Sequence, residues 1–203
     1  MKKILAALPL IIATPLLAQM QMPKEAPGKV DVKRVTAGTY SVDTDHSLVA
    51  WSVNHFGFND YFGLFGGATG SLTIDPAKPN AASVSIEIPM TGLTTVNPKL
   101  NGHLSSPDFL DVAKYTTAKF VSTKVVTKGT TASILGNLTL HGVTKPVTLN
   151  AKFSGAGENV MSKKANIGFA ATTTIKRSEF GMGAFIPLVS DAVDLKITVA
   201  FVK

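Results

Sequence analysis

The stretch VDLKITVAF, residues 193–201, decides the fold of this chain. Its apolar residues occupy every second position, and the residues between them are mostly polar. Successive side chains of a β-strand point to opposite faces, so this run predicts a strand with one apolar face. Two other runs alternate in the same way, Val84 to Met90 and Val147 to Phe153. We therefore expect an all-β protein.

Turn signals divide the alternating sequence into strands expected near residues 39–44, 47–56, 64–75, 81–91, 117–127, 131–140, 143–154, 164–176 and 192–202. So many strands with so little helix favour a sheet closed into an eight-stranded barrel, whose interior is filled by side chains or holds one small ligand. Asn97 to Tyr115 lacks alternation and predicts a short helical insert near one mouth, with Ser106-Pro107-Asp108 resembling a helix cap. A hairpin is expected at His141-Gly142, after which Pro146 requires an edge position or a bulge.

The first residues resemble an export signal. A short positive segment, Met1 to Lys3, precedes an apolar run that ends near a plausible cleavage site at Ala18. This order predicts a signal peptide over residues 1–18, and hence a protein exported to a bacterial periplasm. An uncleaved anchor is the alternative, although the run is shorter than the roughly 20 residues of a spanning helix. Residues 19–38 have no hydrophobic period and predict a flexible tether before a barrel domain over 39–203.

Composition excludes several classes of function. The chain has no Cys, so no disulfide or thiolate chemistry is available. The formal net charge of +7 is compatible with transient contact with an anionic membrane surface. Binding to nucleic acid is not expected, because the basic residues form no clustered stripe.

Candidate catalytic groups are sparse. No Gly-x-Ser-x-Gly nucleophile motif is present, and the carboxylates are scattered. A metal-dependent periplasmic enzyme is the alternative function, and it requires His46, His55 and His103 to converge on one ion. Their spacing is not that of a helical zinc site.

Two loops are rich in aromatic residues. They predict either packing into the domain, the mouth of an apolar cavity, or a surface that touches a membrane. The residues that we expect at such a mouth are Phe58, Phe62, Phe65, Phe180 and Phe185.

Several short motifs, in order and spacing, resemble the YceI-like family. They are YSVD at 40–43, WSVNHFG at 51–57, HLSSPDFLDVAKY at 103–115, GNLTLHGVTKPV at 136–147 and RSEFG at 177–181. The resemblance covers about Tyr40 to Phe201. It implies an extended eight-stranded, lipocalin-like antiparallel barrel with a helical insert. It also implies an exported protein that holds a polyisoprenoid or another amphiphilic chain in its lumen and has no catalytic residues. Ligand identity varies within the family and does not carry over.

A lipid carrier needs an apolar lumen, formed by one face of the alternating strands. The residues that we expect to line it are Trp51, Val53, Leu72, Ile86, Phe120, Leu138, Leu149, Phe169, Leu195 and Ile197. A head group would lie at a mouth near Lys99, Lys114 or Arg177. A register error of one residue would invert every choice of lining residue.

No cofactor other than the bound lipid is expected, and a homodimer stays open. A third class of protein, the outer-membrane barrel, would have its apolar faces outside and its polar faces inside.

Overall fold

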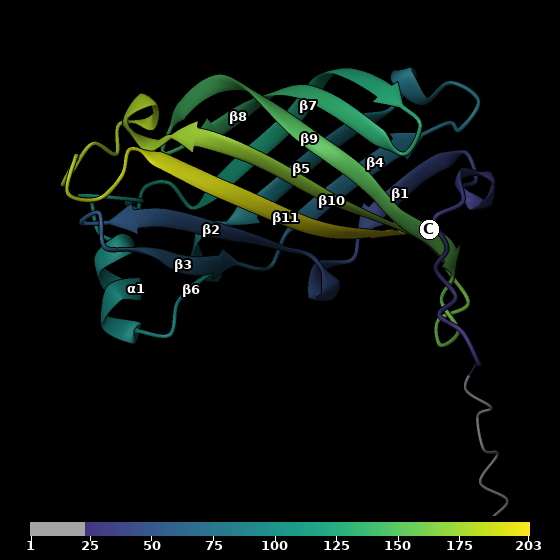
Figure 1. The fold of residues 1–203 in the computed structure, drawn as a ribbon, viewed down its shortest axis with the longest axis horizontal. Coiled ribbons are helices and arrows are strands. Elements are labelled where there is room, and N and C mark those ends of the chain that lie inside the picture. Colours follow the sequence, from purple (N-terminus) through teal and green to yellow (C-terminus); the bar gives the residue numbers. More distant parts are fainter. Residues whose placement is uncertain (1–22) are drawn as a thin grey trace, which may run out of the picture.

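The alternating runs form the strands of one antiparallel sheet in the computed structural model, which describes residues 23–203 (Figure 1). The strands are β1 Gly38–Val42, β2 Leu48–His55, β3 Asn59–Phe65, β4 Thr69–Ile74, β5 Ser83–Pro89, β6 Leu93–Thr94, β7 Thr117–Lys128, β8 Thr131–Leu140, β9 Val143–Glu158, β10 Ala165–Lys176 and β11 Ala192–Val202. The helix α1 spans Pro98–Leu104, and the short 3₁₀ turns are η1 Val32–Arg34, η2 Thr44–His46, η3 Pro79–Ala81, η4 Met90–Gly92 and η5 Arg177–Phe180.

The sheet closes because β1 pairs with β4 on one side and with the end of β11 on the other. The ring therefore runs β1-β4-β5-β7-β8-β9-β10-β11, which makes eight strands. β2, β3 and β6 extend the sheet from β11 towards one end of the barrel. The fold class predicted from the sequence, a closed eight-stranded antiparallel barrel with one short helix, is confirmed.

One predicted strand is two strands. The run expected over 64–75 is interrupted at Gly66-Gly67, so β3 ends at Phe65 and β4 begins at Thr69. β3 instead starts at Asn59 and pairs with β2, which places Phe58 and Phe62 on a hairpin. This hairpin lies at the left of Figure 1.

The turn predicted at His141-Gly142 is confirmed, since Leu140 pairs with Val143 directly across it. Pro146 pairs with Asn137 of β8. The pairing of β9 with β10 starts only at Asn150, so within residues 23–203 Pro146 lies where β9 pairs with no strand on its second side. Its missing N–H is tolerated there, as expected for an edge position.

The helix of the insert begins earlier than the motif around Ser106 suggested. Asn97 is the N-cap, and its side chain accepts hydrogen bonds from the N–H groups of Lys99 and Leu100. Pro98 occupies the first turn, where its lack of an N–H costs nothing. Ser106 follows the helix in a series of turns.

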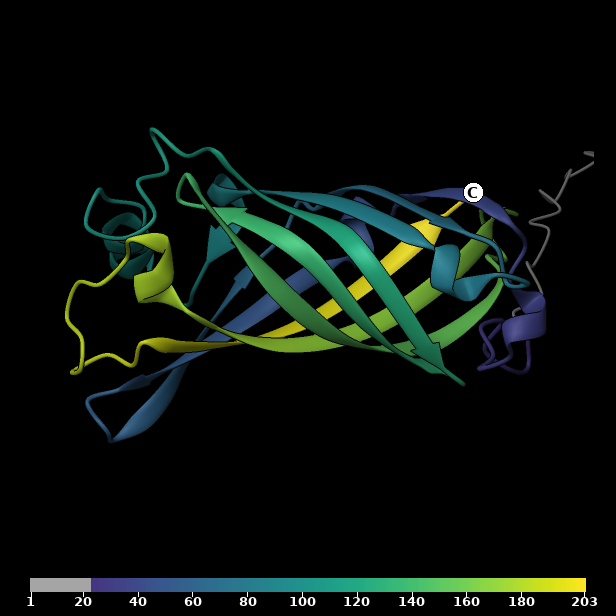
Figure 2. The ribbon, with the colours of Figure 1, turned by 90° about the horizontal axis from the view of Figure 1, so that it is seen from above.

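The connections gather at two ends, which are clearly separated in Figure 2. We call one the open end; it consists of residues 23–37, 75–82, 128–131 and 158–165. We call the other the closed end; it consists of residues 55–60, 95–116, 141–142 and 177–191. The two ends differ in their packing, as described below.

The predicted signal peptide, residues 1–18, lies outside the described residues. Within the segment predicted as a tether, Lys29 pairs with Ala156 of β9 through hydrogen bonds in both directions, of 3.1 and 2.9 Å. Val35 of this segment is buried in the larger hydrophobic cluster of the barrel. The chain therefore contacts the barrel from Lys29 onwards. Within residues 23–203, no helix has the length and apolarity needed to cross a membrane.

Candidate functional site

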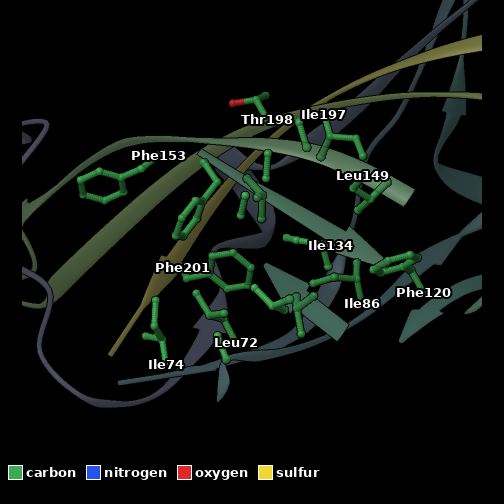
Figure 3. Close-up of a pocket in the computed structure, with 18 of the residues that line it drawn as sticks. Leu72, Ile74, Ile86, Phe120, Ile134, Leu149, Phe153, Ile197, Thr198 and Phe201 are labelled. Carbon is green, nitrogen blue, oxygen red and sulfur yellow. The ribbon is translucent and has the colours of Figure 1, made fainter. Parts of the chain in front are cut away.

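The barrel encloses an apolar cavity of about 330 Å³, lined by side chains from β2, β4, β5 and β7 to β11 (Figure 3). This volume is at the lower end of the range of about 300–1,000 Å³ that is typical of small-molecule sites. Within residues 23–203, no charged side chain lines the cavity. The labelled aliphatic and aromatic side chains of Figure 3 surround a shared space, whereas the hydroxyl of Thr198 is turned away from it.

Eight of the ten residues predicted from strand alternation line this cavity. They are Leu72, Ile86, Phe120, Leu138, Leu149, Phe169, Leu195 and Ile197. The sequence prediction omitted Ile134 and Phe153, which also line it. Both belong to alternating strands, so the same signal could have found them.

Trp51 and Val53 lie on the inward face of β2 but outside the cavity. Trp51 is directly opposite Leu195, which fixes the face, and β2 then runs on towards the closed end. The indole ring of Trp51 covers the Cα of its cross-strand partner Gly63. A side chain at position 63 would collide with the ring, so the glycine permits this packing.

Phe120 makes a similar contact with Gly136 on the neighbouring strand β8. A Cβ at position 136 would overlap the ring of Phe120 and would lie 2.6 Å from the carbonyl oxygen of Val121. Because Gly136 has no side chain, the ring lies against the wall of the barrel, and space is left in the lumen.

The cavity reaches the surface at the open end. Its lining there includes Pro76 and Pro79 from the β4–β5 connection and Gly129 to Thr131 from the β7–β8 turn, and all of these residues are exposed. Val32 of η1 lines the cavity as well and is 49% exposed. No sequence signal indicated Val32, because it lies in a segment without hydrophobic periodicity.

The cavity stops before the closed end, where a second apolar cluster fills the barrel. Ile175, Phe180 and Met182 are its buried members, and Phe180 is only 1% exposed. Leu138 and Leu195 contact this cluster and also line the cavity, so they mark the boundary between the two. We call this cluster the plug.

None of the five aromatic residues predicted at a ligand mouth lines the cavity. Phe180 belongs to the plug, and Phe65 is half-buried at the end of β3. Phe58 is 87% exposed at the tip of the β2–β3 hairpin, and Phe62 is also exposed. Phe185 stacks on Phe109, with 5.9 Å between the ring centroids. All five lie at the closed end or on β3, away from the mouth.

The three residues predicted to meet a head group also belong to the closed end. Arg177 is 5% exposed, and its guanidinium donates hydrogen bonds to the carbonyl oxygens of Met182, Ala184, Val189 and Ser190. Burial lowers the pKa of this guanidinium. Arg177 therefore holds the loop over residues 181–190, a role different from the predicted one. Lys99 and Lys114 are exposed and lie far along the barrel from the mouth.

The structure does not assemble a metal site from the histidines. His46 and His55 lie at opposite ends of β2, and His103 packs against Phe109 and Phe185. Across residues 23–203, no three His, Cys, Asp or Glu side chains are placed to hold an ion. A hydrogen bond of 2.9 Å to Asp43 and the charge of that carboxylate raise the pKa of His46.

The orientation of the strand faces bears on the outer-membrane alternative. Inward residues such as Leu149 and Ile197 are apolar, whereas their outward neighbours Thr148 and Lys196 are exposed. This is the reverse of the polar interior and apolar exterior that such barrels have.

Comparisons with known proteins agree with this geometry. A family model described as the YceI-like domain matches residues 40–201. A UPF0312 protein of Pseudomonas putida (strain W619) is 41% identical over 173 residues, which cover 82% of this chain and 88% of that protein. The crystal structure of Burkholderia cenocepacia BcnA aligns with a TM-score of 0.71 at 24% identity, covering 78% of this chain and 98% of that one. A domain from Saccharophagus degradans, described as polyisoprenoid binding, aligns with a TM-score of 0.60 at 16% identity, covering 80% and 97%.

Proposed function

The chain belongs to the YceI-like domain family, and from this premise we propose that it is a non-enzymatic carrier of a long-chain isoprenoid or another amphiphilic lipid. The observation that carries the proposal is the apolar cavity of about 330 Å³, which opens at one end of the barrel and is blocked at the other. A ligand that fits this shape has a long apolar tail and a polar head. The tail lies inside the barrel, and the head stays at the open end.

The energetics favour such a tail. Each buried methylene contributes roughly 0.8 kcal/mol, from which the cost of ordering the chain is subtracted. A tail of many methylenes therefore binds without any specific polar contact. An ionised head group has no charged partner among the lining residues, so it is more stable near water at the mouth than inside.

Two further observations support the proposal. The Saccharophagus degradans domain that shares this fold is described as binding a polyisoprenoid. In addition, residues 1–18 have the order of segments of a signal peptide, so we propose that the carrier works in the periplasm.

The direct test is to isolate the protein from its own cells, denature it and extract it with organic solvent. Mass spectrometry should then detect a long-chain isoprenoid or fatty lipid in an amount close to that of the barrel. An extract that contains only solvent would contradict the proposal.

A matched pair of variants localises the ligand. Leu149→Arg puts an unpaired charge into the cavity and should lower the lipid content per folded barrel about tenfold or more. Thr148→Arg changes the neighbouring residue, whose side chain is outside, and should leave the lipid content unchanged.

If the Leu149→Arg variant does not fold, the variant Ala132→Phe provides a second test of the same prediction. Ala132 lines the cavity near the open end, and a phenylalanine there keeps the interior apolar while narrowing the entrance. We expect less lipid in this variant as well. Wild-type lipid content in both cavity variants would place the ligand outside the barrel.

A further inference from the structure

The two ends of the barrel carry opposite charge. The segments of the open end contain eight Lys or Arg and four Asp or Glu, whereas those of the closed end contain three and five. The basic residues of the open end are Lys24, Lys29, Lys33, Arg34, Lys78, Lys128, Lys163 and Lys164. The positive charge of the protein is therefore concentrated around the mouth of the cavity.

The acidic residues of the open end are already engaged. Glu25 pairs with Lys29 at 2.5 Å, and Glu158 lies 3.9 Å from Lys163. The side chains of the other two, Asp31 and Asp75, accept hydrogen bonds from backbone N–H groups.

Five exposed lysines at this end remain available to a partner. Two of them are Lys24 and Lys164, and the other three come from different segments. Among residues 23–203, no carboxylate lies within 4 Å of the amines of Lys33, Lys78 or Lys128. These lysines come from three separate segments, so they surround the mouth and do not form a single charge run.

Exposed apolar side chains accompany this charge. Val30 is 62% exposed and Met161 is 65% exposed, each within two residues of a lysine. The pairing of Lys29 with Ala156 holds the N-terminal segment beside the end of β9, close to the loop that carries Met161. Val32, which lines the cavity, joins this exposed surface to the mouth. Apolar side chains beside basic ones are typical of surfaces that lie on the interface of an anionic bilayer.

We propose that the open end docks on an anionic lipid bilayer, with the mouth of the cavity facing the membrane. This inference rests on the proposed function, since a carrier that faces the membrane exchanges its lipid without exposing the tail to water. The basic residues supply the attraction to the anionic head groups, and Val30, Val32 and Met161 enter the interface.

The closed end is the rival surface, because it exposes large aromatic side chains such as Phe58 and Phe62. Its excess of acidic residues repels an anionic surface, however, and no part of the cavity opens there. The open end combines the attraction with the opening.

Binding to vesicles tests the docking surface. The protein isolated from its own cells should bind vesicles of phosphatidylcholine and phosphatidylglycerol, should bind phosphatidylcholine vesicles weakly, and should lose affinity as salt is added. The double variant Lys78→Glu/Lys128→Glu should have an affinity for the anionic vesicles that is lower by about 30-fold or more. The control Lys176→Glu/Lys196→Glu makes the same change in net charge on exposed residues away from the open end, and it should retain wild-type affinity.

Single labels test the orientation, because the chain has no Cys and one introduced thiol is the only site of reaction. An environment-sensitive dye on Met161→Cys should shift its emission to the blue on anionic vesicles. The same dye on Phe58→Cys, at the closed end, should not shift.

Equal loss of affinity in both double variants, tight binding to phosphatidylcholine alone, absence of vesicle binding, or a shift at position 58 alone would each overturn the docking proposal. These results would leave the carrier proposal intact wherever lipid is still extracted from the barrel. An empty barrel would instead overturn the carrier proposal, whatever the vesicles show.

Discussion

The two ends of this barrel are built from the same alternating strands, and yet one is open and the other is filled. At the closed end, Phe180 and Met182 fold back into the barrel, and Arg177 satisfies four carbonyl oxygens of the loop that follows. At the open end, Arg34 is exposed, and within residues 23–203 its guanidinium makes one hydrogen bond, to the carbonyl oxygen of Pro27. The comparison shows that the strands create the lumen, while the loops decide from which side it can be entered.

Individual polar groups of the two ends also differ in how they are bonded. At the closed end, Asp191 follows the loop that Arg177 holds, and it accepts hydrogen bonds from the N–H and the hydroxyl of Ser178. Exposed open-end lysines such as Lys78 and Lys128 have no carboxylate partner among residues 23–203. We therefore expect substitutions at the closed end to change stability and those at the open end to change binding.

The largest expected effect is that of Arg177→Met. Four carbonyl oxygens lose their donor at a site where water has little access, and an unsatisfied buried acceptor costs about 1–3 kcal/mol. We expect the free energy of unfolding to fall by about 3 kcal/mol or more. Denaturant unfolding followed by circular dichroism measures the change.

Arg34→Met is the matched substitution at the open end. It removes one exposed hydrogen bond of 3.0 Å, so the free energy of unfolding should change by about 0.5 kcal/mol or less. Similar losses of unfolding free energy in Arg177→Met and Arg34→Met would contradict the view that only the closed end contributes strongly to stability.

The strands, the closure of the sheet and most of the cavity lining could be predicted from the sequence, because a period of two assigns each residue to one face. Leu149 and Ile197 follow directly from this period. The choice of mouth does not follow, since Phe58 and Phe180 both lie in aromatic, glycine-containing loops. Their exposure, 87% and 1%, depends on how each loop packs against distant strands.

Arg177 illustrates the same limit for a charged residue. The sequence predicts Arg177 as a charged partner of a head group at a mouth, and most arginines are exposed. Its burial depends on the loop over residues 181–190, whose carbonyl oxygens accept hydrogen bonds from the guanidinium. The residue types of this loop do not predict that geometry. The contribution of Val32 to the mouth could not be predicted either, because its segment has no hydrophobic periodicity.

A smaller effect is expected where the cavity approaches the plug. Gly136→Ala would place a methyl group against the ring of Phe120 and near the carbonyl oxygen of Val121. We expect the ring to move into the lumen, a loss of about 1–3 kcal/mol in the free energy of unfolding, and less extractable lipid per barrel. Unfolding curves and lipid mass spectrometry measure the two consequences.

Gly168→Ala is the control for this substitution. The added methyl group would lie 3.6 Å from the Cβ of Ser154, an ordinary contact, and Gly168 precedes the inward-facing Phe169. Stability and lipid content should both stay close to those of the wild type. An unchanged lipid content in Gly136→Ala would show that the position of Phe120 does not limit the space available to the ligand.

The smallest expected effect is on stability at acidic pH. The hydrogen bonds from the N–H and the hydroxyl of Ser178, each 2.8 Å long, hold the pKa of Asp191 below its usual value of 3.8. Because the folded pKa lies below the unfolded one, this stabilisation is complete above about pH 3.8 and is lost as the pH falls through the folded pKa. An NMR titration of the carboxyl carbon should show the low pKa, and Ser178→Ala should raise it part of the way by removing only the hydroxyl donor. A titration of Asp191 at or above pH 3.8 in the wild type would mean that the hydrogen bonds of the closed end are weaker in solution than their geometry indicates.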